Sequence, residues 1–141
     1  MSIKTKRIGD IGEELACGYL GGKGYKILER NFRTVFGEID IIAKSPLKTL
    51  TFIEVKTIKL SSNFIDSFPE SYPHFSGNIN KPAILPEDNL STTKLLKFRK
   101  IAQWYANNNQ NLCSHGYQLD AVCITVSPDH KPISIKHFEN V

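Results

Sequence analysis

The chain has 141 residues, of which 40% are hydrophobic and 23% are charged, with a formal net charge of +4. This composition is typical of a soluble globular protein, and the length suits one domain with its own core. The apolar runs are too short for a membrane-spanning helix, and no apolar stretch follows the charged amino terminus as in a secretory signal. We therefore expect a single cytoplasmic domain over residues 1–141 that does not bind membranes. The positive charge is compatible with a polyanionic partner but favours one only slightly.

The first third of the chain has the pattern of a helix followed by three strands. Apolar residues at helical spacing predict a helix from about Lys6 to Gly21, which further glycines bring to an end. β-branched and aromatic residues predict strands at Tyr25–Phe32, Glu38–Ala43 and Leu50–Ile58. Because only short turns join these strands, they are expected to run antiparallel, as a meander.

The stretch Ser61–Asn89 has a different character from the segments on either side. It contains four prolines among serines and asparagines and has no sustained hydrophobic period. Such a composition predicts a long loop inserted in the domain, although its aromatic residues argue against full disorder.

The last third of the chain predicts one more helix and one or two strands. The helix is expected to begin near Thr92, where a threonine can cap it, and to run to about Asn108. Strands are expected at Tyr117–Val126 and Pro132–Phe138. The order helix, three strands, helix, one or two strands predicts an α+β or mixed-sheet α/β domain.

Acidic side chains interrupt the second predicted strand. In an extended strand, successive side chains point to opposite faces of the sheet. We therefore expect Ile39 and Ile41 on one side and Glu38, Asp40 and Ile42 on the other.

The third predicted strand carries a further acid and a lysine. Glu54 and Lys56 are expected to share one side of it. If the second and third strands pair across their short turn, Asp40 and Glu54 lie close together on one face, with Lys56 one step along.

Two carboxylates beside a lysine suit Mg²⁺-assisted hydrolysis of a phosphodiester. Mg²⁺ takes one or two carboxylates together with water and phosphate oxygens, and it makes the bound water a better nucleophile. A nearby ammonium group stabilises the charge that develops at the phosphorus. The pattern alone is weak, however, because charged residues on a solvated strand face often form a cross-strand ion pair and nothing more.

Several motifs together resemble the YraN family of small bacterial proteins, which belongs to the restriction-endonuclease-like group that includes archaeal Holliday-junction resolvases. The resemblance covers most of residues 7–57 and resumes at residues 97–105 and 118–120. It rests on the motifs Gly12-Glu13, Gly24-Tyr25-Lys26-Ile27-Leu28, Asn31-Phe32-Arg33, Gly37-Glu38-Ile39-Asp40-Ile41-Ile42-Ala43 and Phe52-Ile53-Glu54-Val55-Lys56-Thr57.

The resemblance implies a restriction-endonuclease-like core, with a mixed sheet between helices, and it assigns roles to four residues. Asp40 and Glu54 are implied as metal ligands, and Lys56 as the catalytic lysine. Glu13 fits a further acidic position in the first helix of such resolvases, with a share in catalysis and metal binding. The alternative for Glu13 is a glutamate that the helix dipole favours near the start of a helix, and the residues alone leave both open. Its neighbour Glu14 is expected to be solvated.

Three positions depart from the family pattern. Ile58 stands where the family has arginine after the Glu-Val-Lys-Thr run, Phe98 replaces a glutamine, and Gln118 replaces an arginine before Leu119-Asp120. The acidic and lysine positions are intact, so the departures bear on phosphate contacts and substrate choice rather than on metal binding.

Basic residues provide candidate contacts with nucleic acid. Lys94, Lys97 and Lys100 recur at three-residue steps along one face of the second helix, and Arg33 belongs to one of the matched motifs. Such side chains contact the phosphate backbone without reading sequence. The alternative is a basic helix face that is simply solvated.

The histidines and a late aspartate are expected to have no catalytic role. His74, His115, His130 and His137 lie in predicted loops or near the carboxyl end, where exposure to solvent is expected. Asp120 lies in a hydrophobic strand and is expected to close a hydrogen-bond network rather than to bind metal.

These inferences predict a Mg²⁺- or Mn²⁺-dependent endonuclease that acts on DNA, with branched DNA as one candidate substrate. The alternative is a nucleic-acid-binding module that keeps the fold without turnover, which the missing cations at Ile58 and Gln118 favour. A homodimer would suit DNA with two-fold symmetry, but the residues identify no interface.

Overall fold

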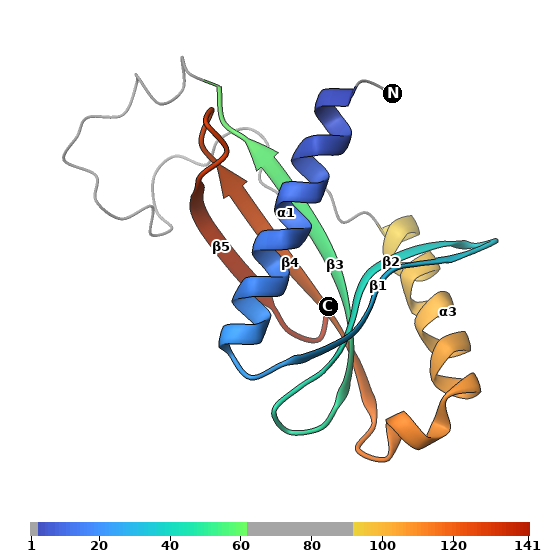
Figure 1. Ribbon diagram of the computed structural model, residues 1–141. Coiled ribbons are helices and arrows are strands. Elements are labelled where there is room, and N and C mark those ends of the chain that lie inside the picture. Colours follow the sequence, from blue (N-terminus) through green and yellow to red (C-terminus); the bar gives the residue numbers. More distant parts are fainter. Residues whose placement is uncertain (1–2, 62–91) are drawn as a thin grey trace.

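The computed structural model describes residues 3–61 and 92–141, which form a five-stranded sheet with a long helix on each side (Figure 1). All the elements expected in this part of the chain are present, with ends that differ from the expected ones by at most three residues. The loop expected over residues 61–89 lies, apart from its first residue, outside the described residues. The elements are α1 (Ile3–Gly22), β1 (Lys26–Thr34), β2 (Gly37–Lys44), β3 (Leu50–Lys59), α3 (Thr92–Asn108), the short helix η2 (Gln110–Cys113), β4 (Tyr117–Val126) and β5 (Pro132–Phe138).

The sheet is mixed, with its five strands in sequence order. Antiparallel pairing joins β1 to β2 and β2 to β3, which confirms the meander, and β4 to β5. β3 and β4 run parallel, with Leu50 opposite Tyr117 and Lys59 opposite Val126. Two parallel neighbours need a crossover connection, and α3 lies in it.

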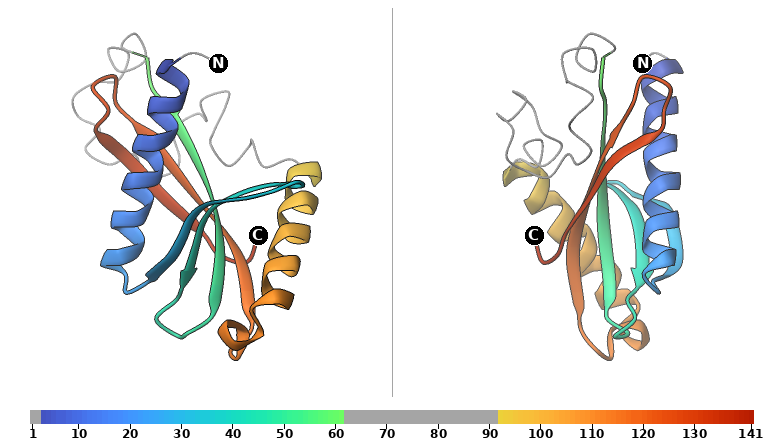
Figure 2. Two further views of the ribbon diagram at one scale, coloured as in Figure 1. Left: turned by 45° about the vertical axis from the view of Figure 1, so that its right-hand side comes forward. Right: turned by 90° about the vertical axis from the view of Figure 1, so that its left-hand side faces the viewer.

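The two long helices cover opposite faces of the sheet (Figure 2). On the α1 face, Ala16 and Leu20 are buried against residues of the central strands, among them Ile53. On the other face, Phe98 and Ile101 of α3 pack in a second cluster with strand residues such as Phe52. None of the helices within residues 3–61 and 92–141 has both the length and the apolar character needed to cross a membrane.

β2 rotates at Asp40, so the expected alternation of its side chains is wrong. Ile41 belongs to the cluster under α1, whereas Ile39 belongs to the cluster under α3. The ladder between β2 and β3 begins at the pair Ile41 and Ile53, so β2 has no partner in β3 before that point. On the adjoining part of β1, Asn31 has a left-handed φ of 53°. The β1–β2 hairpin therefore leaves the sheet at Asp40 and reaches across to α3 (Figure 1).

A buried pair of titratable groups joins β4 to the carboxyl end of the chain. The His137 side chain is only 4% exposed, and its Nε2 lies 2.7 Å from Oδ2 of the buried Asp120. Asp120 also accepts hydrogen bonds from the side chain of Gln118 and from the backbone N–H of Asn140. The expected hydrogen-bond network at Asp120 is present, whereas the expectation that His137 is solvent-exposed is wrong. His74 lies outside the described residues.

Candidate active site

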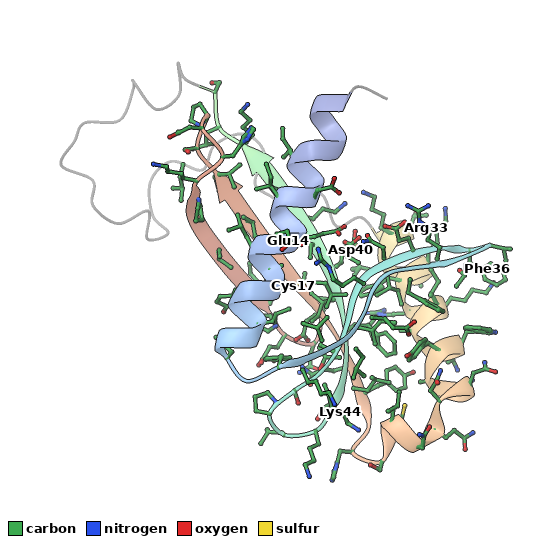
Figure 3. The ribbon with its side chains drawn as sticks, in the orientation of Figure 1. Glu14, Cys17, Arg33, Phe36, Asp40 and Lys44 are labelled. Carbon is green, nitrogen blue, oxygen red and sulfur yellow. The ribbon has the colours of Figure 1, made fainter. Side chains whose placement is uncertain are left out.

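Asp40 occupies the point where β2 separates from β3 (Figure 3). Its Oδ2 accepts a hydrogen bond of 2.8 Å from the backbone N–H of Val55. Beyond the end of the β2–β3 ladder this N–H of β3 has no β2 carbonyl opposite it, and a buried backbone donor needs an acceptor. The carboxylate of Asp40 supplies one, and it is thereby fixed beside the middle of β3.

Glu54 and Lys56 project from β3 next to this point. Lys56 Nζ lies 3.4 Å from Glu54 Oε1, and the two side chains are only 19% and 21% exposed. Glu54 also interacts with the carboxyl group of Asp40, both through charge and through a side-chain hydrogen bond. The structure therefore brings together the two acids and the lysine that the sequence singled out.

Glu13 reaches the same place from α1. One carboxylate oxygen from each of Glu13, Glu38 and Asp40 lies within 4.8 Å of the other two. The Glu13 side chain is only 14% exposed, and this burial raises its pKa despite the Arg30 guanidinium, whose Nη2 lies 4.0 Å from Glu13 Oε2. Glu14, one step round the helix, pairs with Arg30 at 2.6 Å and is exposed, as expected.

Glu38 is a member of this acidic group that the sequence did not single out. Its Oε2 lies 3.0 Å from Nε of Arg33, and both side chains belong to the β1–β2 hairpin. The available signal was its place two residues before Asp40 in a matched motif. Which carboxylates meet, however, depends on where α1 crosses the sheet, and strand periodicity does not contain that information.

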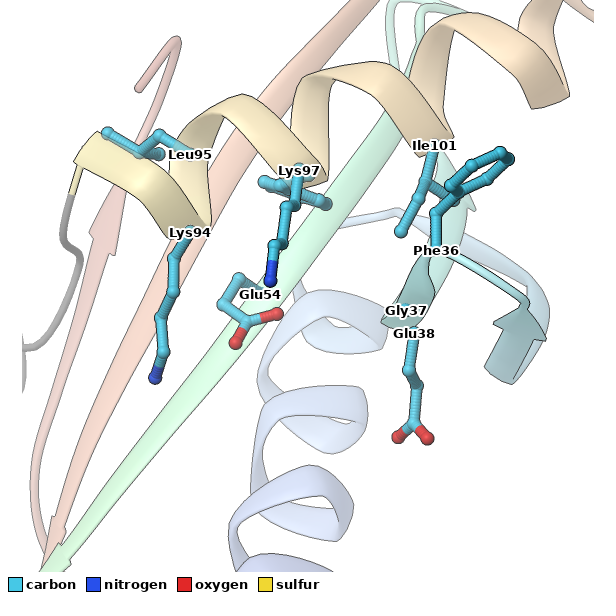
Figure 4. Close-up of a pocket in the computed structure, with 9 residues that line it drawn as sticks. Phe36, Gly37, Glu38, Glu54, Lys94, Leu95, Lys97 and Ile101 are labelled. Atoms are coloured by element: carbon cyan, nitrogen blue, oxygen red, sulfur yellow. The ribbon is translucent and has the colours of Figure 1, made fainter.

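Glu54 lies between two hollows in the surface. The smaller, with a volume of about 160 Å³, is also lined by Glu38, Lys94 and Lys97 (Figure 4). The larger, of about 540 Å³, is lined by Glu13, Asp40 and Lys56, among others. The acidic group is thus reachable from solvent on both sides of β3.

The acids of this site repel one another in the protein without a metal. Burial, and after it the neighbouring carboxylate of Glu54, raises the pKa of Asp40 from 3.8 to about 8. Carboxylate oxygens are the hard ligands that Mg²⁺ and Mn²⁺ accept, and a divalent cation removes the repulsion that favours the protonated acid. The converging oxygens of Asp40, Glu13 and Glu38, with Glu54 next to Asp40, therefore fit such an ion.

This pKa predicts how the stability of the metal-free protein depends on pH. Between about pH 4 and pH 8, folded Asp40 holds a proton that the unfolded chain has released, so the free energy of unfolding must fall as the pH rises through this range. Urea unfolding in EDTA at a series of pH values measures the slope. We expect Asp40→Asn to flatten it, with a smaller slope remaining from Glu13. An equal slope in both proteins would show that Asp40 ionises normally.

Comparison with known proteins places the chain in a family. Residues 12–124 match the sequence pattern of the uncharacterised protein family UPF0102. The chain belongs to this family. It is the YraN family that the sequence motifs resemble.

UPF0102 proteins from several bacteria resemble the chain over nearly its whole length. The UPF0102 protein of Thermodesulfovibrio yellowstonii is 38% identical over 94% of this chain and 93% of its own length. That of Alkaliphilus oremlandii is 35% identical over 96% of this chain and 97% of its own length. That of Desulforamulus reducens is 29% identical over 99% and 98% respectively.

The four basic residues of this UPF0102 chain that are candidate contacts with nucleic acid fall into two groups. Lys94 and Lys97 line the smaller hollow beside Glu54, and the neighbouring amino group of Lys56 lowers the pKa of Lys94. Lys100 lies on α3 with its amino group over the ring of Phe36 at the hairpin tip, and Arg33 lies on the hairpin in its ion pair with Glu38. All four residues therefore lie beside the acidic group or in contact with the hairpin that leads away from it.

Proposed function

We propose that this UPF0102 protein is a Mg²⁺- or Mn²⁺-dependent endonuclease that hydrolyses phosphodiester bonds in DNA. The observation that carries the proposal is the meeting of Asp40, Glu54 and Glu13 with the ammonium group of Lys56 at one point of the sheet. Several acids of the site already have a base nearby, as Glu54 has Lys56 and Glu38 has Arg33. Burial and the Glu54 carboxylate nevertheless raise the pKa of Asp40 to about 8, a cost that a divalent cation offsets.

Each residue has a distinct part in the proposed reaction. Asp40 and Glu54 would hold the metal, with Glu13 assisting from α1. A metal bound there would activate a water molecule and neutralise negative charge on the phosphate. Lys56 would orient the attacking water and donate hydrogen bonds to the phosphate oxygens as they gain charge. The water oxygen would bond to phosphorus as the water loses a proton, the bond to the leaving oxygen would break, and the leaving oxygen would take up a proton in place of the one that the water released.

Cationic side chains near the acids would bind the DNA backbone. Lys94 and Lys97 lie where a phosphate could approach Glu54, and Lys100 and Arg33 extend the positive charge along the hairpin. Such contacts give affinity without sequence preference, and they weaken as salt is added.

The test is DNA cleavage by the purified protein. Labelled linear duplex, flap and four-way junction DNA are incubated with the protein in Mn²⁺, beside an Asp40→Ala variant. We expect cleavage by the wild type that the variant lacks. Equal cleavage by both proteins on every substrate would show that the activity is a contaminant.

A second candidate function is a nucleic-acid-binding module without turnover. Ile58 and Gln118 favour it, because cations that the family pattern places there are missing, and Gln118 instead donates its hydrogen bonds to Asp120. Titration calorimetry separates the two functions: the module would bind DNA in a salt-dependent way and give no heat with Mg²⁺ or Mn²⁺.

A further inference from the structure

The tip of the β1–β2 hairpin carries two exposed apolar side chains. Val35 is 96% exposed and Phe36 is 50% exposed, and together they form the two-residue connection between β1 and β2. Tight connections of this kind usually have glycine, asparagine or aspartate, which fit the turn and prefer water. Phe36 is half covered by its contacts with α3, but the exposed half of its surface and nearly all of Val35 gain nothing for the fold, so a contact with another molecule is a reason for their presence.

The tip is held in place rather than left loose. Thr34 Oγ1 accepts a hydrogen bond from the Phe36 N–H and donates one to the Gly37 carbonyl, each at 3.1 Å. The backbone of Gly37, with a φ of 140°, lies so close to α3 that an added Cβ would come within 3.3 Å of Ile101 Cδ1. The hairpin therefore presents Val35 and Phe36 from a fixed platform on α3.

The tip stands next to the acidic group and is flanked by positive charge. Phe36 lines the smaller hollow together with Glu54 and Lys97 (Figure 4). Lys100 Nζ lies over one face of the Phe36 ring, 4.7 Å from its centre, in a cation–π contact, and half of the Phe36 surface remains exposed. An exposed aromatic face among cations is the combination by which proteins hold unstacked nucleobases and their phosphates.

We propose that Val35 and Phe36 form a wedge that packs against nucleobases exposed where DNA strands branch, and so selects branched DNA over continuous duplex. The inference rests on the proposed function and deepens it by naming the substrate class. In continuous duplex the base faces are covered by stacking, so an apolar tip meets only sugars and phosphates. At a branch point a base face is open, and Phe36 can cover it while Lys97 and Lys100 lie near the flanking phosphates.

The charge around the tip favours nucleic acid over a protein partner as its occupant. Lys97 and Lys100 lie beside the tip on α3, and Arg33 lies just before it on β1. In an interface with a protein, these cations would lie at the rim, and Val35 and Phe36 would be the only apolar side chains at the centre. Two side chains are far less than the area that a specific protein interface buries.

The test measures base unstacking without cleavage. A fluorescent adenine analogue, 2-aminopurine, is placed either at the branch point of a three-way junction or in the middle of one arm. Binding is followed in Ca²⁺. We expect the wild type to raise the fluorescence of the branch-point base several-fold and to leave the arm base unchanged.

Phe36→Ala is the test variant. We expect it to lose most of the branch-point signal and to bind the junction about tenfold more weakly, because stacking on one base contributes roughly 1–3 kcal/mol. Its affinity for linear duplex should be unchanged. Phe36→Trp should restore the signal, because it keeps an aromatic face. Leu47→Ala is the matched control, because Leu47 is an exposed apolar residue (84%) on a different turn.

The outcomes separate this inference from the proposed function. If Phe36→Ala gives the same branch-point signal and junction affinity as the wild type and Leu47→Ala, the wedge is overturned, whatever the cleavage assay shows. If the signal depends on Phe36 but Mn²⁺ supports no cleavage, the wedge stands and the nuclease is overturned. Failure of the wild type to bind any of these DNAs at low salt overturns both.

Discussion

Replacing Lys56 with methionine is expected to lower the rate of DNA cleavage by about 10²–10³-fold without weakening the binding of Mg²⁺. The ammonium group of Lys56 lies 3.4 Å from Glu54 Oε1. A metal ion at Glu54 would replace this attraction with a stronger one, which leaves Lys56 able to turn towards water and phosphate. Methionine keeps the length and the apolar stem of the side chain and removes only the charge.

Lys56→Met is expected to lower the rate of cleavage but not the affinity for Mg²⁺. Lys56 and the metal compete for the same carboxylate oxygens, so loss of the lysine should leave Mg²⁺ affinity equal or slightly higher. Calorimetry with Mg²⁺ and single-turnover cleavage of a labelled junction measure the two quantities on one protein preparation. Lys131→Met is the control, because that lysine is 80% exposed and makes only a 4.0 Å pair with Asp129.

Whereas Lys56→Met is expected to lose cleavage alone, Asp40→Asn is expected to lose metal binding together with cleavage. It removes a ligand charge while an amide oxygen can still accept the Val55 hydrogen bond, so the fold should survive and both metal binding and cleavage should be lost. If Lys56→Met lost metal binding as well, Lys56 would be a structural partner of Glu54 rather than a catalytic group. If it cleaved at the wild-type rate, the assignment of Lys56 would be wrong.

The sequence predicted the elements of the fold well because their patterns are local. Strand alternation and helical spacing depend on neighbours within a few residues, and the bounds Tyr117–Val126 and Pro132–Phe138 agree fully with the structure. The parallel pairing of β3 with β4, in contrast, joins residues that are far apart in the sequence. It joins Leu50 to Tyr117 across a connection of more than fifty residues, so the order of elements left an α+β and a mixed-sheet α/β domain open and the family resemblance favoured the mixed sheet.

The site was predicted in part, and the errors have physical causes. Alternation along a straight strand placed Ile39 and Ile41 on one face, but β2 rotates where its pairing with β3 ends. His137 was expected in solvent because it lies near the carboxyl end, whereas its partner Asp120 is 17 residues earlier in the chain and fully buried. In both cases contacts between strands determine where the side chain lies, and the spacing of residues within one strand does not contain that information.

Replacing Gly12 with alanine is expected to destabilise the protein by about 2–3 kcal/mol, although alanine is the better helix former. Gly12 lies where α1 crosses β3. A Cβ at this position would overlap Thr57 Oγ1 and would lie 2.8 Å from Thr57 Cβ. Because Thr57 is part of the sheet, α1 must move away, and the burial of Ala16 and Leu20 is reduced.

The matched control is Gly18→Ala in the same helix. No atom lies within 4 Å of a Cβ built there, so the substitution should stabilise the protein by about 0.5–1 kcal/mol. Urea unfolding of both variants measures the difference. A double variant, Gly12→Ala with Thr57→Ala, should recover part of the loss, because it removes Oγ1 while Cβ remains.

The same contact links the packing of α1 to the candidate active site. Glu13 follows Gly12 directly and reaches Asp40 only because α1 lies this close to β3. Gly12→Ala should therefore weaken Mg²⁺ binding in the molecules that remain folded, and the double variant should restore it in part. If Gly12→Ala lost stability but kept full metal affinity, the metal would be held without Glu13, by Asp40 and Glu54 of the sheet alone.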